Sequence, residues 1–160
     1  VRMLNVLKKL FSEGNKNEET ISEVVNSKNN LQIATCAIFL EIAYSDDNFS
    51  NIEKEQIFKI FRKQFNLSDS EIEELIMHTE EVRKKSVSLY EFTEVINHKL
   101  SAEDKYKIVE NLWRIILADN VINSYEEYFI RKISGNLNVS HNNLIAAKFV
   151  VKEEMEKTNS

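Results

Sequence analysis

The sequence contains no proline and only two glycines, Gly14 and Gly135, among its 160 residues. Sheet-rich domains turn often and tightly, and such turns favour both residue types. A chain with almost none of either suits long helices joined by short polar links. The composition therefore predicts an all-α fold, and the length fits a single domain.

Cysteine is also scarce, since Cys36 is the only one. A single cysteine excludes an intrachain disulfide and a cysteine-cluster zinc site. Cys36 lies within an apolar run, where a free thiol is usually a small core residue. No apolar stretch approaches the ~20 residues that span a bilayer. The first eight residues lack the apolar core and cleavage site of a signal peptide, so we expect a cytoplasmic protein.

Positive charge is not in excess, because the net charge is −5. The domain as a whole therefore offers no basic footprint for nucleic acid. Local basic runs at residues 59–63 and 83–85 are predicted to be solvated helix faces. The sequence also lacks a glycine-rich phosphate loop and a recognisable nucleophile–base pair, so we expect no enzymatic activity.

Helix starts are marked by capping boxes, in which a polar side chain and an acidic residue three positions later satisfy each other's backbone amides. The sequence offers these boxes at Thr20 with Glu23, Ser50 with Glu53, Ser68 with Glu71, Ser88 with Glu91 and Asn123 with Glu126, and weaker caps at Ser101 with Asp104, at Ser140 and at Asn29 or Asn30. They predict a bundle of about seven to nine helices. Their expected spans are 3–12, 20–26, 30–45, 51–65, 69–85, 89–99, 102–118, 124–134 and 141–157. Gly135 is predicted to end its helix in a left-handed conformation.

The polar stretch 12–19 has no packing pattern and is predicted to be a mobile linker. It divides the chain into an N-terminal helix plus linker, 1–19, and a helical domain, 20–160. Residues 3–11 form an amphipathic pattern that suits either peripheral membrane contact or docking onto the domain.

An internal repeat links residues 41–60 to residues 114–133, which align without gaps at an offset of 73. The alignment predicts a pseudo-twofold arrangement in which equivalent helix–turn–helix units pack together. After one deletion, the match continues from Asn66-Leu67-Ser68 to Asn138-Val139-Ser140. The identical pairs are Ile42/Ile115, Asp46/Asp119, Glu53/Glu126, Ile57/Ile130, Lys59/Lys132 and Ile60/Ile133.

The doubled pattern of an apolar helix, Asp46 or Asp119, a polar turn, and Glu53 or Glu126 resembles the TerB tellurite-resistance family. The stretch from Leu89 to the Trp113 helix is also similar to bacterial TerB-like proteins of unassigned function, and the resemblance covers roughly residues 30–150. It implies an all-helical domain in which acidic residues at the ends of paired helices hold a metal ion. A related domain occurs at the front of some membrane-anchored DnaJ-like co-chaperones.

TerB relatives often place glycine directly after the motif aspartate, whereas this chain has Asp47 and Asn120 there. Both residue types tolerate a left-handed backbone better than most. The turns are therefore expected to survive the difference.

Four carboxylates, Asp46, Glu53, Asp119 and Glu126, are the candidate metal ligands. Hard divalent cations such as Ca²⁺ or Mg²⁺ require several oxygens converging from different segments. Helix capping by the glutamates and turn formation by the aspartates explain the same residues without a metal. A true EF-hand is excluded, because Asn51 and Ile57 replace the glycine and glutamate of its loop.

The remaining candidates are histidines and aromatic residues. Glu74 with His78 and Glu94 with His98 are predicted to be surface pairs one turn apart. Tyr125, Tyr128 and Phe129 crowd one helix and are expected in the core, although an exposed aromatic patch would suit a protein partner. The sequence and resemblance together predict a stress-response module that binds a divalent metal. The alternative is a non-catalytic helical module that docks a membrane-associated or chaperone partner.

Overall fold

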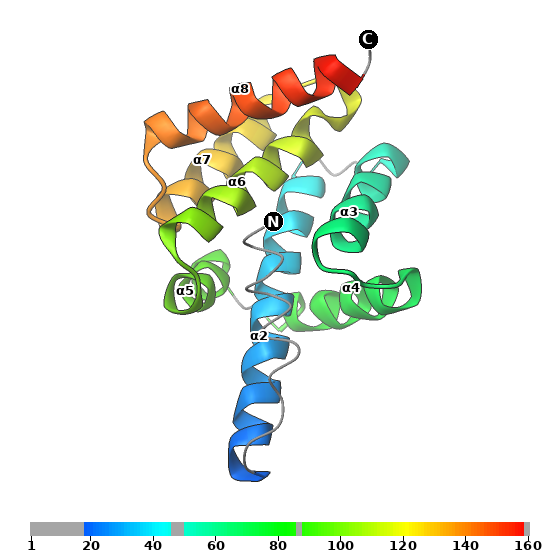
Figure 1. The fold of residues 1–160 in the computed structure, drawn as a ribbon, viewed down its shortest axis with the longest axis vertical. Helices are drawn as coiled ribbons and strands as arrows, with labels where there is room; N and C mark the ends of the chain where they lie inside the picture. The colour runs from blue at the N-terminus through cyan, green and yellow to red at the C-terminus, as the bar shows by residue number, and fades with distance from the viewer. Residues whose placement is uncertain (1–17, 46–49, 86–87, 159–160) are drawn as a thin grey trace.

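The computed structural model describes residues 18–45, 50–85 and 88–158, with side chains from residue 30 onward. Over these residues the chain forms seven α-helices and one 3₁₀ turn, with no strand (Figure 1). The predicted helix 3–12 lies outside the described residues. The helices are α2 (Glu18–Ala43), α3 (Asn51–Gln64), α4 (Asp69–Arg83), α5 (Leu89–Lys99), α6 (Ala102–Ile116), α7 (Ser124–Asn136) and α8 (His141–Thr158), and the 3₁₀ turn η1 (Leu117–Asp119) follows α6.

The predicted caps begin most of these helices. Full capping boxes form at the starts of α4, α5 and α7, each with an acidic residue at the third helical position. The hydroxyls of Ser50, Ser101 and Ser140 each accept a hydrogen bond of 3.2 Å from the amide three residues later. These side chains satisfy amides that a helix leaves unbonded at its first turn.

α2 corrects the prediction of two helices over 20–26 and 30–45. It is one continuous helix that begins at Glu18, so Thr20, Asn29 and Asn30 lie inside it and do not cap its start. Asparagine inside a helix costs less than about 0.7 kcal/mol relative to alanine. Burial of the apolar surface that begins at Leu31 outweighs this cost, because no proline or glycine interrupts the segment.

Gly135 also departs from expectation, because it lies inside α7 and has no positive φ. The left-handed residue after α7 is Asn138, at φ 60°, and Asn66 after α3 matches it at φ 55°. Asparagine visits this region through short-range hydrogen bonds of its side chain. The two repeat-equivalent asparagines therefore adopt the left-handed conformation that was expected of a glycine after the helix.

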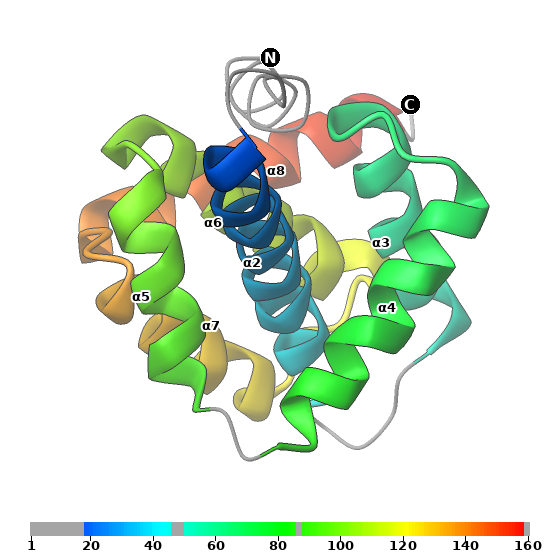
Figure 2. The same ribbon diagram turned by 90° about the horizontal axis from the view of Figure 1, so that it is seen from below.

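The core surrounds α2, which Figure 2 shows in the middle of the other helices. From Leu31 to Ala43 nearly every side chain of α2 is buried, and α4, α5, α6 and α7 all contact the helix. A helix that is apolar all round must be covered on every side. Cys36 lies in this helix, and desolvation by burial raises the pKa of its thiol to about 12. Cys36 is therefore an inert core residue, as predicted.

α6 and α8 pack together along one side of the molecule, with α7 beside them (Figure 1). The buried Trp113 of α6 joins the pair, because its indole N–H donates a 2.9 Å hydrogen bond to the carbonyl of Leu144 in α8. Arg114 adds an ion pair with Glu154 at 2.9 Å. These contacts fix α8 against the last turn of α6.

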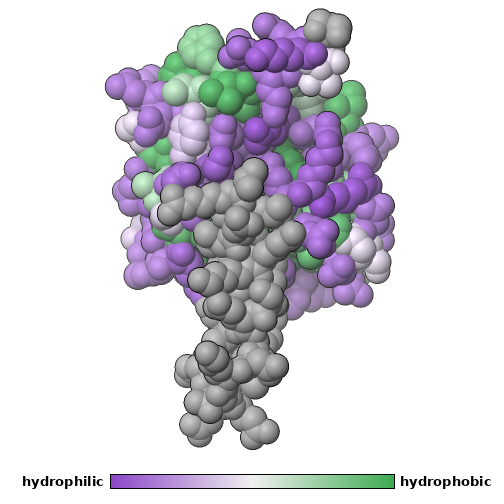
Figure 3. Space-filling view, viewed as in Figure 1, coloured by the Kyte–Doolittle hydropathy of each residue, from purple (hydrophilic) through white to green (hydrophobic). Residues whose placement is uncertain are grey.

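The surface is mainly hydrophilic on the face drawn in Figure 3, with hydrophobic residues along the middle of α8. Phe149 and Val150 are 64% and 45% exposed there. Within the described ranges, no helix has the length and hydropathy needed to cross a membrane.

Candidate functional site

The predicted metal ligands belong to two equivalent turns, one between α2 and α3 and the other between α6 and α7. Asp46 and Asp47 lie outside the described residues. Glu53 is the third residue of α3, Asp119 ends η1, and Glu126 is the third residue of α7.

The second turn is described in full. The Asp119 carboxylate accepts a 3.0 Å hydrogen bond from the amide of Val121. Asn120 has φ 62°, in the left-handed region, and its amide donates to the carbonyl of Leu117 at 3.0 Å. The prediction that Asn120 permits a left-handed turn is therefore confirmed.

Substitutions at Asn120 test whether this turn requires a left-handed backbone conformation. We expect Asn120→Val to lower the free energy of unfolding by about 1–2 kcal/mol, because a β-branched residue is strained at positive φ. Asn120→Gly should leave stability unchanged within about 0.5 kcal/mol. Urea denaturation measures both, and equal stability of the two variants would refute the conformational explanation.

Glu126 is 3% exposed and is bound to the cap of α7. Its Oε1 accepts hydrogen bonds from the backbone amide of Asn123 at 3.3 Å and from the Asn123 side-chain amide at 2.7 Å. Its own backbone amide donates to Asn123 Oδ1 at 2.8 Å. The Asn123 side-chain oxygen therefore accepts the capping hydrogen bond at the start of α7.

Glu53 is buried to the same degree, with 4% of its surface exposed. Glu71 and Glu91 occupy the same capping-box position in α4 and α5, yet both are exposed. Glu71 caps while solvated, and the Ser68 backbone N–H lowers the pKa of its carboxyl group. Capping thus explains the glutamates of α4, α5 and α7, where the full box forms. It does not explain why the two repeat-equivalent glutamates are buried, which is rare for this residue type.

The helices that carry the two glutamates each contact an element of the other half of the repeat. α3 carries Glu53 and contacts η1, which carries Asp119, while α7 carries Glu126 and contacts α2. Among the described residues, however, no group of three His, Cys, Asp or Glu side chains is close enough to hold a metal ion. Glu53, Asp119 and Glu126 therefore do not form such a group by themselves.

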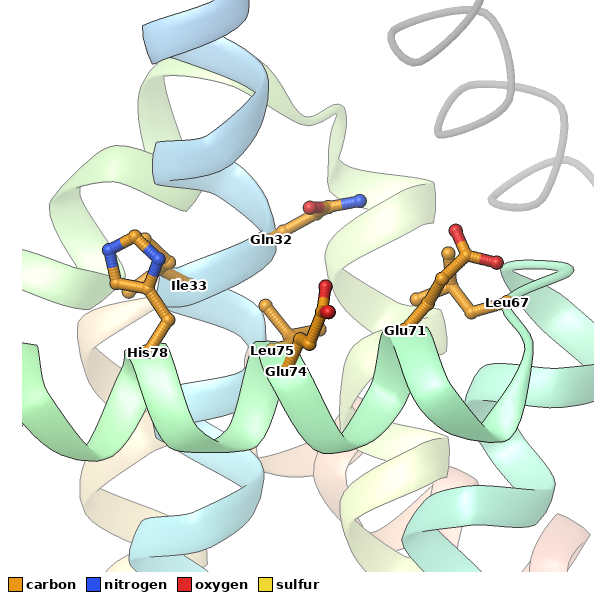
Figure 4. Close-up of a pocket in the computed structure, with 7 residues that line it drawn as sticks. All are labelled: Gln32, Ile33, Leu67, Glu71, Glu74, Leu75 and His78. Carbon is orange, nitrogen blue, oxygen red and sulfur yellow. The ribbon is translucent and has the colours of Figure 1, made fainter.

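A separate groove of about 230 Å³ lies between α2 and α4. Figure 4 shows Glu71, Glu74 and His78 rising from one side of α4, with Glu74 pointing toward Gln32 of α2 and Leu75 beside it. The row combines acid and imidazole groups at helical spacing, but it is not a three-ligand metal group either. His98 forms its predicted surface pair with Glu94, at 3.4 Å.

The aromatic residues of α7 correct the sequence prediction of core packing. Tyr125 and Tyr128 are 62% and 59% exposed, and only Phe129 packs partly against the core. The inward side of α7 is already filled by Ile130 and Ile133. Since residues three apart share a helix face, the two tyrosines lie together on the outer side.

The chain matches the sequence model of the family described as tellurite resistance protein TerB over residues 32–149. The chain belongs to the TerB family. The match begins within α2 and ends within α8, so it includes the second acidic turn, both buried glutamates and the position of Asp46. Comparison of this TerB chain with curated proteins and with solved structures finds no match.

Proposed function

We propose that this TerB domain is a cytoplasmic stress-response module that binds a divalent cation through Asp46, Glu53, Asp119 and Glu126. The burial of Glu53 and Glu126, set against the exposure of Glu71 and Glu91 at the same helical position, carries the proposal. A buried carboxylate is costly unless a compensating charge or hydrogen bonds accompany it. A cation shared between the two turns would place a positive charge beside both carboxylates. The family description supports the association with tellurite resistance.

A pseudo-twofold arrangement of the repeat is the second part of this proposal. Three contacts support it: α2 contacts α6, α3 contacts α6, and α7 contacts α2. In the repeat, α2 corresponds to α6 and α3 corresponds to α7. Replacing each helix by its counterpart turns this set of three contacts into itself, as a twofold axis requires. The left-handed Asn66 and Asn138 also occupy equivalent places. Such an arrangement places the two acidic turns at one pseudo-axis.

The donor set favours a hard cation, because all four proposed ligands are carboxylates. Ca²⁺ accepts six to eight oxygens in flexible geometry, whereas Mg²⁺ keeps several of its waters. The described carboxylates do not form a ready three-ligand group. We therefore expect cation binding to draw the two turns together, with no catalytic step involved.

Direct calorimetric titration tests the cation site. We expect the chelator-stripped protein to bind Ca²⁺ or Mg²⁺ saturably, because the proposed site offers four carboxylates to one ion. Glu53→Gln/Glu126→Gln should weaken binding by at least about tenfold, since two charged ligands become neutral. Mn²⁺ and Zn²⁺ serve as comparison cations.

The chain supplies a matched control in Glu71→Gln/Glu91→Gln. These substitutions remove the same charge from the same capping-box position on α4 and α5, but at exposed sites. The control should bind as wild type does. Equal binding by both double variants would remove Glu53 and Glu126 from the site.

We infer a second candidate function, a docking surface for a membrane-associated or chaperone partner on α7. The exposed Tyr125 and Tyr128 favour it, and Val121 in the turn before α7 is also 62% exposed. Tyrosine is enriched at protein interfaces because it combines large apolar area with a polar tip.

A double substitution separates this function from folding. Tyr125→Ser/Tyr128→Ser should change the free energy of unfolding by no more than about 0.5 kcal/mol per site, as is usual for surface positions. The same change should abolish recovery of any specific partner in affinity capture. Exposed Tyr90 of α5 provides the control as Tyr90→Ser. Recovery unaffected by the α7 change would refute the docking surface.

A further inference from the structure

A cavity of about 440 Å³ lies between α3, α6 and the last turns of α8. It shares no residue with the acidic turns. Buried Ile60 and half-buried Met155 form its apolar part, and both belong to the hydrophobic core or pack against it. Small-molecule sites in proteins have volumes of roughly 300–1,000 Å³ and combine apolar walls with few polar groups. The cavity has the size of such a site, and polar and charged side chains make up most of its lining.

The polar wall of this cavity is held by hydrogen bonds between side chains of α3, α6 and α8. Gln64 and Asn111 exchange two side-chain amide hydrogen bonds of 2.9 Å each, and Asn111 is 0% exposed. Arg114 donates to Asn111 Oδ1 at 2.7 Å and to the Glu154 carboxylate at 2.9 and 3.4 Å. A guanidinium carries five N–H groups, so Arg114 keeps donors beyond these three bonds. Groups held in this way need little reordering when a ligand binds.

The cavity also carries surplus positive charge. Lys59 and Lys63 lie one turn apart on α3, both exposed, and neither forms an ion pair within the described part of the chain. By contrast, Arg62 of the same helix is held by Glu55 and Asp69. Glu154 offsets Arg114, so two positive charges remain uncompensated at the cavity of a chain whose net charge is −5.

We propose that this cavity binds a small amphipathic anion. Its carboxylate, phosphate or sulfonate group contacts Lys59 and Lys63, and its apolar part lies against Ile60 and Met155. Two ammonium groups one turn apart can share a single anionic group through charge-assisted hydrogen bonds. The anion site uses none of the proposed cation ligands, so the test of one site does not depend on the result for the other.

Fluorescence titration of the full chain with anilinonaphthalene sulfonate tests the proposal, because this probe joins a sulfonate to an apolar ring system. We expect saturable binding that Lys59→Gln/Lys63→Gln weakens by at least about tenfold, as expected for losing two charge-assisted contacts. Lys84→Gln/Lys85→Gln changes the net charge equally at exposed lysines that follow α4, outside the cavity, and should bind as wild type does.

A neutral probe completes the test. Phenylnaphthylamine has the same rings without the sulfonate, and we expect it to bind weakly and equally to all three proteins. The proposal is overturned if Lys59→Gln/Lys63→Gln binds the sulfonate probe as tightly as wild type does. It is also overturned if the control loses the same affinity, or if the neutral probe binds wild type as tightly as the anionic one. Unfolding curves confirm that these surface variants are folded.

Discussion

Replacing Trp113 with alanine is expected to lower the free energy of unfolding by about 3–5 kcal/mol. Trp113 is 2% exposed, and its indole N–H donates to the Leu144 carbonyl at 2.9 Å. The Lys148 ammonium lies 5.2 Å from the centre of its ring. The substitution therefore removes a large buried side chain, a buried hydrogen bond and a cation–π contact between α6 and α8. Urea denaturation measures the loss.

The substitution Trp113→Phe separates the contribution of the buried ring from that of the indole hydrogen bond. Phenylalanine keeps much of the buried apolar volume but donates no hydrogen bond to Leu144, so we expect a smaller loss of about 1–2 kcal/mol. A loss below about 1 kcal/mol for Trp113→Ala would contradict the packing of α8 on α6, since cavities from buried tryptophans cost several times more.

The second large effect concerns the proposed repeat. Ile57 of α3 and Ile130 of α7 are equivalent in the alignment, and they are 0% and 1% exposed. We expect Ile57→Ala and Ile130→Ala each to lower the free energy of unfolding by about 2–5 kcal/mol. If the two helices are packed equivalently, the two losses should agree within about 1 kcal/mol, since the cost depends on the surrounding packing.

The exposed identities of the repeat supply the control for this comparison. Lys59→Ala and Lys132→Ala remove equivalent exposed side chains from the same two helices and should each change stability by less than about 0.5 kcal/mol. Losses for the two isoleucines that differ by more than about 2 kcal/mol would count against equivalent packing of the two units.

Local sequence signals predicted most of the fold, and long-range packing decided the rest. The starts of α4, α5 and α7 follow from capping boxes, because those hydrogen bonds join residues three apart. The continuity of α2 does not follow from local signals. Asn29 and Asn30 suggest a start, but the helix continues through them into a fully covered core segment.

The candidate site shows the same limit. The alignment singled out Glu53 and Glu126 as equivalent glutamates, but their spacing from the cap residue is the same as that of Glu71 and Glu91, which are exposed. Burial depends on which helices cover each turn.

The cavity of α3, α6 and α8 was missed entirely. Its wall joins Gln64 to Asn111 across 47 positions of the sequence. The run containing Lys59 and Lys63 was predicted only as a solvated face. A buried asparagine and a half-buried glutamine leave no periodic signal in a sequence, because tertiary structure determines their partners.

The central claim is that the two buried glutamates serve a divalent cation. Thermal unfolding of the chelator-stripped protein with increasing Ca²⁺ or Mg²⁺ tests it most directly, because a ligand of the folded state must stabilise that state. At a hundredfold excess over the dissociation constant, the stabilisation is about 2.7 kcal/mol. We expect a saturable rise of the unfolding midpoint by roughly 5–10 °C. The rise should disappear in Glu53→Gln/Glu126→Gln and persist in Glu71→Gln/Glu91→Gln. An unchanged midpoint with either cation, or an equal rise in both double variants, would contradict it.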